Sequence, residues 1–208
     1  LGQIRQPVDA IALGIALVPE DRRNHGLILA ESIAGNIALP NLDTLQIAKM
    51  LNFRGIQTTA LKGVSSLKIR TTGIAKQAGQ LSGGNQQKVV LYKWLHRQPK
   101  LLILDEPTRG LDYQAKNQLI STLLRYARVL GRTVILATHD VELVAELATR
   151  VIFLADGDCV ADGKTLDVLL SSPAFAPQVA KVMSPAPWLT VKDALRGIAA
   201  ATGKDSKE

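Results

Sequence analysis

Residues 101–107 have the sequence Leu101-Leu102-Ile103-Leu104-Asp105-Glu106-Pro107, in which an apolar run is followed at once by two acids. A short apolar run bounded by charge is typical of a buried strand in a parallel sheet. Such strands deliver their last residues to the edge where ligands bind in doubly wound folds. The stretch predicts an α/β fold with a ligand site at this edge; an acidic turn that merely ends the strand is the alternative.

The two carboxylates suit different tasks, because adjacent strand residues point to opposite sides. Asp105 suits a magnesium shell, through water, since Mg²⁺ keeps most of its waters and takes few carboxylates. Glu106 suits a general base or a residue that positions water for attack on a γ-phosphate. We therefore predict Asp105 as the metal residue and Glu106 as catalytic.

The rest of the chain alternates between apolar strands and helical patterns. This alternation predicts a mostly parallel sheet with helices on both faces. A hairpin over 151–155 and 159–161, joined by Asp156-Gly157-Asp158, is expected to close one edge of that sheet. Strands are expected at 15–18, 101–104, 133–137 and 151–155, and helices at 7–13, 32–39, 44–54, 83–98, 113–130, 141–148 and 165–170.

A second informative stretch is LSGGNQQK, residues 81–88. Two adjacent glycines at a helix start let backbone N–H groups approach an anion closely, and the helix dipole favours negative charge there. The hydroxyl of Ser82 can add a hydrogen bond. The stretch predicts a phosphate site at Ser82, Gly83 and Gly84, against the alternative of a serine-capped helix after a glycine turn.

Two further polar residues follow strands of the same predicted sheet. Asp112 ends the stretch TRGLD over 108–112; it either caps the next helix or contributes to contact with another site. His139 follows the strand 133–137, which places it at the sheet edge of Asp105 and Glu106. From there an imidazole can reach a phosphate oxygen, so we predict His139 as catalytic.

Composition narrows the function classes. The chain has 208 residues, 47% of them hydrophobic, and no apolar run long enough to span a bilayer, so we expect a soluble protein. A single cysteine excludes an internal disulfide and a structural site of four cysteines. The net charge is +7, but the basic residues are scattered and only 4% of residues are aromatic, so we expect no direct nucleic-acid binding.

In order and spacing, the 81–88 string, the Asp-Glu strand end, the 108–112 loop and Thr138-His139-Asp140 resemble the ABC ATPase family over about residues 1–170. The resemblance implies a partial, RecA-like cassette over 1–172, with an inserted helical signature subdomain over about 30–97 and a C-terminal appendage over 173–208. It also implies ATP and Mg²⁺ as cofactors. The residues expected to contact nucleotide are Leu81, Ser82, Gly83, Gly84, Asn85, Gln86, Asp112 and Glu20.

The family also implies partners. Two cassettes would pair head to tail with two ATP molecules between them. Ser82, Gly83 and Gly84 would contact ATP held by the partner, while Asp105, Glu106 and His139 would serve the cassette's own nucleotide face. Finer similarities divide the chain. Residues 1–112 resemble the second cassette of monosaccharide importers, including Glu20 where most cassettes have glutamine, and residues 138–190 resemble energy-coupling-factor ATPases that serve vitamin or metal uptake.

One family element is missing from its expected place. The phosphate-binding loop, G-x-x-x-x-G-K-[ST], should precede residue 81, and nothing in residues 1–80 matches it. The nearest string, Gly163-Lys164-Thr165, has Asp158 at the first glycine position and is interpreted as a turn before a terminal helix. We expect weak ATP binding by this chain alone and a phosphate loop encoded upstream.

The leading prediction is an ATP-hydrolysing subunit at the cytoplasmic face of the membrane, peripheral, that energises import of a small solute, foremost a sugar. A transmembrane permease and a solute-binding protein would be its partners. Three alternatives stay open. They are a vitamin or metal importer ATPase, a soluble ABC ATPase acting on nucleic acid or ribosomes, and an inert cassette that lends only its 82–84 segment to another chain's ATP.

Overall fold

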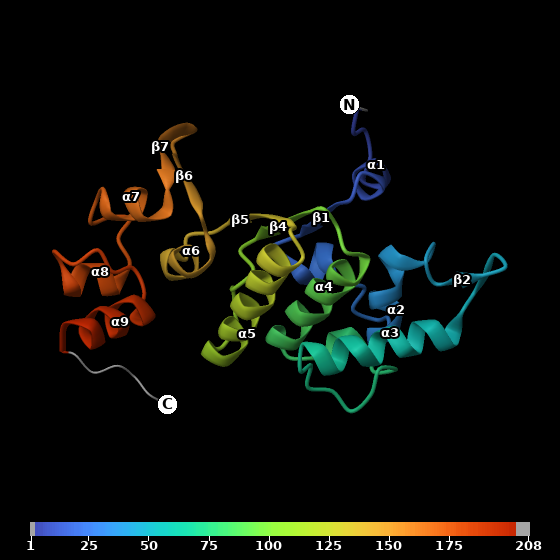
Figure 1. Ribbon diagram of the computed structural model, residues 1–208. Coiled ribbons are helices and arrows are strands. Elements are labelled where there is room, and N and C mark those ends of the chain that lie inside the picture. Colours follow the sequence, from blue (N-terminus) through green and yellow to red (C-terminus); the bar gives the residue numbers. More distant parts are fainter. Residues whose placement is uncertain (1–2, 203–208) are drawn as a thin grey trace. The chain divides into compact units, whose positions relative to one another are not determined.

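The computed structural model describes residues 3–202 and divides the chain into two compact units, Leu1–Ala137 and Thr138–Glu208 (Figure 1). Residues 1–2 of the predicted cassette and 203–208 of the predicted appendage lie outside the described range. Between residues 3 and 202, no helix combines the length and apolar character that a membrane crossing requires.

The first unit is built on three parallel strands in the order β1-β4-β5. Their bounds are β1 Ile15–Val18, β4 Leu101–Asp105 and β5 Thr133–Ala137. In register, Leu101 faces both Ile15 and Thr133, so all three strands start together, and β1 ends one residue before β4 and β5. The predicted parallel sheet is confirmed, and Asp105 faces Ala137 at its carboxyl edge.

Helices cover one face of this sheet. Ala16, Val18, Leu102 and Leu104 point into the core and are at most 3% exposed. The chain crosses the sheet twice in the same direction, from β1 to β4 and from β4 to β5, and right-handed crossovers then place both sets of helices on one face. The helices of this unit are α1 Pro7–Ala12, α2 Ile33–Ala38, α3 Phe53–Ser66, α4 Gly83–Arg97 and α5 Tyr113–Leu124.

The opposite face of the sheet is partly open to solvent in this unit. Leu17 and Ile135, which alternate with the core residues, are each 50% exposed. Side chains one residue apart on a strand point to opposite faces, so the exposed pair marks the uncovered face. Sequence alone cannot distinguish the open face from the covered one, because both faces of each strand carry apolar residues.

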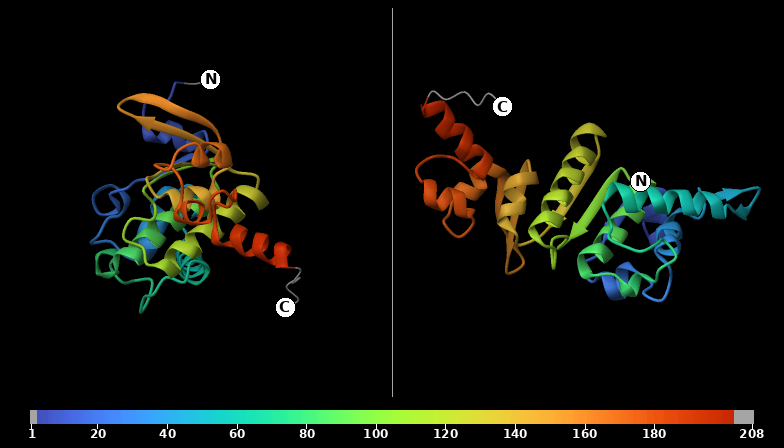
Figure 2. Two further views of the ribbon diagram at one scale, coloured as in Figure 1. Left: turned by 90° about the vertical axis from the view of Figure 1, so that its left-hand side faces the viewer. Right: turned by 90° about the horizontal axis from the view of Figure 1, so that it is seen from below.

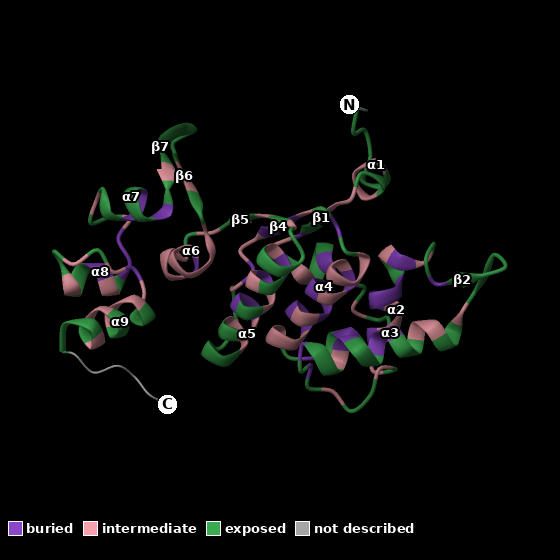
Figure 3. Ribbon diagram, in the orientation of Figure 1, coloured by how far each residue is buried: buried purple, intermediate pink, exposed green. Residues whose placement is uncertain are grey.

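Helices α2, α3 and α4 pack together in the region expected to form the helical subdomain (Figure 3). At Gly63 of α3 the ring of Tyr92 from α4 occupies the space that a side chain would need. Buried Asn41 donates from Nδ2 to the carbonyl oxygens of Ile37 and Lys93, both at 2.9 Å, and so joins α2 to α4. Buried polar bonds of this kind fix one arrangement of the helices.

The helix expected over 44–54 is wrong. The chain forms a hairpin of β2 Gln46–Ile47 and β3 Met50–Leu51, next to the start of α3 (Figure 2). Its turn residues Ala48 and Lys49 have φ values of 50° and 65°, as a two-residue hairpin turn requires. Asn52 then caps α3, since its Oδ1 accepts from Gly55 N at 3.0 Å.

Up to residue 202, the second unit contains the predicted hairpin and four helices. The hairpin forms a sheet of its own rather than an edge of β1-β4-β5, and Asp156 and Gly157 turn it with φ of 52° and 89°. The elements are α6 Val141–Leu147, β6 Arg150–Ala155, β7 Asp158–Lys164, α7 Thr165–Leu170, α8 Gln178–Met183 and α9 Val191–Thr202.

Residues beyond 172 share a hydrophobic cluster with α7. Leu169 packs with Ala176, Ala180 and Leu189, and Phe153 of β6 stacks on Phe175 with ring centroids 3.8 Å apart. The compact units therefore divide after residue 137, whereas the boundary predicted from the family lies after residue 172. That family boundary stays a prediction.

Candidate nucleotide site

The start of α4 is open to solvent at the residues predicted to bind phosphate. Ser82 is exposed, with φ of −61° and ψ of 155° at the N-cap, while Gly83 and Gly84 are half-buried. Ser82 makes no capping bond with its side chain; its Oγ accepts from Asn85 Nδ2 at 2.9 Å instead. Its hydroxyl hydrogen can then point outward, beside the helix's first N–H groups, which lack intrahelical partners.

The residues next to Ser82, Gly83 and Gly84 are buried or hydrogen-bonded within the chain. Leu81 is 8% exposed and Gln86 is 3% exposed, with its Nε2 donating to Ala78 O at 3.2 Å. Asn85 accepts from Arg70 N at 2.9 Å through Oδ1. The structure thus gives Leu81, Asn85 and Gln86 roles in holding the helix start, and their contact with nucleotide stays a prediction.

The acidic strand end has an unusual backbone. Asp105 is the last residue of β4, and Glu106 leaves the sheet with φ of 40°, a left-handed conformation rare for a residue with a side chain. Glu106 N still donates to Ala137 O at 2.9 Å, and Arg109 N donates to Glu106 O at 3.1 Å. Residues held in such conformations cost of order 1–3 kcal/mol and cluster at functional sites.

Two residues of the loop after β1 contact the turn after β4. Glu20 forms an ion pair with Arg109, and Arg22 donates from Nη1 to Arg109 O at 3.3 Å. Sequence reasoning predicted Glu20 as a nucleotide contact, and here its partner is an arginine. No role was predicted for Arg22 or Arg109; the polar segment at the exit of the first strand is the signal that points to Arg22.

Asp112 and His139 differ in what the structure establishes. Asp112 is the N-cap of α5 and accepts from Ala115 N at 2.7 Å, so its capping role is shown. Its contact with another site stays a prediction. His139 follows β5 by two residues but belongs to the second unit, so its expected proximity to Asp105 and Glu106 also stays a prediction.

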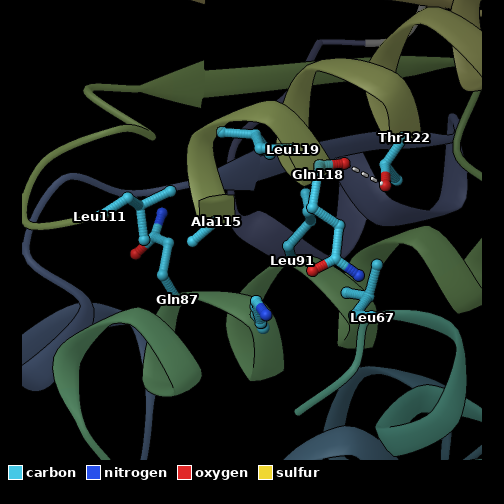
Figure 4. A pocket seen from close by; sticks show the side chains of 9 residues that line it. Leu67, Gln87, Leu91, Leu111, Ala115, Gln118, Leu119 and Thr122 are labelled. Carbon is cyan, nitrogen blue, oxygen red and sulfur yellow. Dashed lines mark hydrogen bonds between the residues drawn. The ribbon is translucent and has the colours of Figure 1, made fainter. Parts of the chain in front are cut away.

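Two other places do not serve as triphosphate sites. A cavity of about 20 Å³ lies between α4 and α5, lined by Gln87, Leu91, Ala115 and Leu119 among others (Figure 4). It has room for about one water molecule, far less than a nucleotide needs. The Gly163-Lys164-Thr165 string ends β7 and starts α7, and Thr165 is 7% exposed with Oγ1 donating to Ala148 O at 2.7 Å.

Asp105 and the start of α4 can each supply only part of a site for Mg²⁺ and ATP. In the described part of the chain, no group of three or more His, Cys, Asp or Glu side chains could hold a metal ion. Mg²⁺ is commonly bound by one or two carboxylates plus substrate phosphates, which is what Asp105 at a strand end can offer. The start of α4 can likewise receive one phosphate group, and the other phosphates need donors from elsewhere.

The chain matches the model of the ABC transporter family over residues 8–109. A putative ABC transporter ATP-binding protein of Streptomyces avermitilis is 41% identical over 185 residues, which are 89% of this chain and 31% of that protein. The ribose import ATP-binding protein RbsA of Shouchella clausii is 42% identical, over 74% of this chain and 30% of its own. The chain thus spans about a third of the length of these curated relatives.

Among solved structures, the dimeric post-hydrolysis state of the ATP-binding cassette MJ0796, bound to ADP and Pi, superposes with a TM-score of 0.65. The alignment covers 77% of this chain and 68% of the cassette at 24% identity, so it supports the fold alone. The parallel sheet, the half-buried glycines at the start of α4 and the acidic end of β4 agree with this likeness. The chain therefore belongs to the ABC transporter family, as an ATP-binding cassette similar to sugar-import ATPases.

Proposed function

We propose that this chain supplies catalytic and signature residues to an ATPase that energises import of a small solute, foremost a sugar. One observation carries the proposal: the start of α4, at the half-buried Gly84, adjoins the loop after the acidic strand. A Cβ on Gly84 would lie 3.6 Å from Leu111 Cδ2, so the helix start lies against the loop that follows Asp105 and Glu106. The ribose import relative supports the sugar class.

The residues of the proposed site have different roles. Ser82, Gly83 and Gly84 offer a hydroxyl and backbone N–H groups to a phosphate held mainly by a partner cassette. Asp105 orients magnesium and its waters at the carboxyl edge of the sheet. Glu106 takes a proton from, or positions, the attacking water. Bound Mg²⁺–ATP supplies the phosphoryl group and the metal charge that stabilises its transfer.

The partners follow from the same surface. A helix start that offers N–H groups to a triphosphate needs a second cassette that carries the phosphate loop, and we propose head-to-tail pairing with such a cassette. Its closing and opening would drive a transmembrane permease fed by a solute-binding protein. The chain would then lie at the cytoplasmic face of the membrane, as a peripheral subunit.

Glu106→Gln tests the hydrolytic role. The change keeps size and hydrogen-bonding capacity but removes the base, so the ATPase rate of an assembly with a phosphate-loop cassette should fall on the order of 100-fold or more. Nucleotide binding, followed by fluorescent ATP titration, should persist. Alone, the chain should show little hydrolysis.

The matched control is Asp158→Asn, which removes an exposed carboxylate on β7. Its rate should equal that of the parent chain. An unchanged rate in Glu106→Gln would instead show that the chain is an inert half that lends only its signature segment. Nucleic-acid binding with a steep salt dependence, in place of ATP turnover, would favour the nucleic-acid alternative.

A further inference from the structure

The guanidinium of Arg22 lies where three segments meet: the loop after β1, the start of α4 and the turn after β4. Its Nη1 donates to Arg109 O at 3.3 Å. A Cβ on Gly83 would collide with Nη2 and lie 3.3 Å from Cζ, and a Cβ on Gly110 would lie 3.7 Å from Nη2. The guanidinium therefore fills the space between two glycines that are distant in sequence.

The two glycines are needed for different reasons. Gly110 has φ of 71°, a conformation that favours glycine whatever surrounds it. Gly83 is the first residue of α4, and its φ is not positive, so its backbone could carry any residue. A side chain at Gly83 would instead meet the end of the Arg22 side chain, which would have to move out of its present contacts. Gly84 differs, since its added Cβ would meet only Leu111 in ordinary contact at 3.6 Å.

Arg22 is held there at a cost. Its Nε is buried and has no hydrogen-bond partner, and an unpaired buried donor is rare in native proteins. A second contact joins the same two segments, because Glu20, two residues earlier, pairs with Arg109. Together these contacts fasten residues 20–22 to residues 109–110 on one side, while Arg22 borders Gly83 on the other.

We propose that Arg22 is a positioning residue that sets the start of α4 relative to the turn after β4. It would keep the contacts of Ser82 and Gly83 with the partner's ATP in a fixed relation to Asp105 and Glu106 at the chain's own nucleotide face. The contact itself is independent of the proposed function; only its consequence for hydrolysis rests on that function.

A double-mutant cycle on folding stability tests the contact. Gly83→Ala and Gly84→Ala are each made in the parent chain and in an Arg22→Met background, and the four unfolding transitions are compared with those of their two parents. In the parent chain, Gly83→Ala should lower the melting temperature by roughly 2–4 °C, because the new methyl group displaces Arg22. In the Arg22→Met background it should behave as Gly84→Ala does.

Gly84→Ala is the control and should leave the melting temperature unchanged or slightly higher in both backgrounds, because alanine restricts the unfolded chain more than glycine does. Equal shifts for Gly83→Ala in the two backgrounds would overturn the contact.

Kinetics test the positioning role. In an assembly with a phosphate-loop cassette, Arg22→Met should lower kcat on the order of tenfold and leave KM for ATP within about twofold, since misplaced groups lose rate rather than binding. Arg22→Lys should not rescue kcat, because an ammonium cannot span both neighbours as the planar fork does. Coupling between Arg22 and Gly83 with an unchanged kcat would overturn the role. No turnover in any variant or parent would refute the proposed function, while the cycle would still decide the contact.

Discussion

Lys93 is a buried cation on α4 and offers a measurable pH dependence. It is 8% exposed, its Nζ donates to Gly26 O, and burial lowers its pKa from 10.5 to about 8. Between these values the unfolded chain binds more protons than the folded chain, so stability rises with pH across this window. The free energy of unfolding attributable to Lys93 should rise by about 2 kcal/mol from pH 8 to pH 10.

Lys93→Met isolates this contribution, because methionine fills similar space without a charge. Urea unfolding at pH 8, 9 and 10 should give a shallower rise for the variant than for the parent chain. Lys88, whose pKa burial also lowers, contributes equally to both proteins and cancels in the difference. Parallel pH profiles would show that Lys93 is not desolvated as the structure indicates.

At the scale of elements, α7 holds the second unit together through Leu169. This side chain is 1% exposed and packs with residues of the segment before α8, of α8 itself and of the segment before α9. Leu169→Ala should lower the unfolding free energy of this unit by about 2–4 kcal/mol through lost burial and a residual cavity. The signal is Trp188 fluorescence during urea unfolding, with Trp94 replaced by Phe.

The neighbouring residue Leu166 provides the control. It lies on the same helix and is 42% exposed, so Leu166→Ala removes the same atoms from a site that solvent already reaches. Its cost should stay near 0.5 kcal/mol. Equal losses at both positions would contradict the packing of α7 in the second unit.

The sequence predicts well those elements whose ends are marked by local residue types. β1, β4 and β5 are short apolar runs with polar punctuation, and the Asp156-Gly157 turn is typical of hairpins. The helix predicted over residues 44–54 is wrong because Ala48 and Lys49 adopt left-handed backbone conformations, which neither residue type predicts. Asn52, a helix cap, was also placed inside the expected helix.

The candidate site was predictable only in part. Ser82, Gly83, Gly84 and Asp105 lie where a helix start and a strand end were expected, since local patterns determine both. The Glu20 and Arg22 contacts with Arg109 span 87–89 residues and depend on how the loops pack, which no local pattern encodes.

For the whole molecule, the proposed ATPase depends on one contact. The start of α4 must receive a phosphate that another cassette holds. Head-to-tail pairing with a second cassette is the proposed functional form. This contact depends on the charge at a helix N-terminus, so one substitution can change phosphate binding without lowering the free energy of unfolding.

Ser82→Asp makes that separation. A carboxylate at the N-cap of α4 favours the helix dipole and should leave the unfolding free energy unchanged or raise it by up to about 1 kcal/mol. The same charge repels phosphate. The measurement is sedimentation velocity of the chain mixed with a phosphate-loop cassette in Mg²⁺–ATP, with hydrolysis blocked by Glu106→Gln in all samples. We predict ATP-dependent pairing for Ser82 and for a neutral Ser82→Asn control, and none for Ser82→Asp; equal pairing by all three would contradict the account.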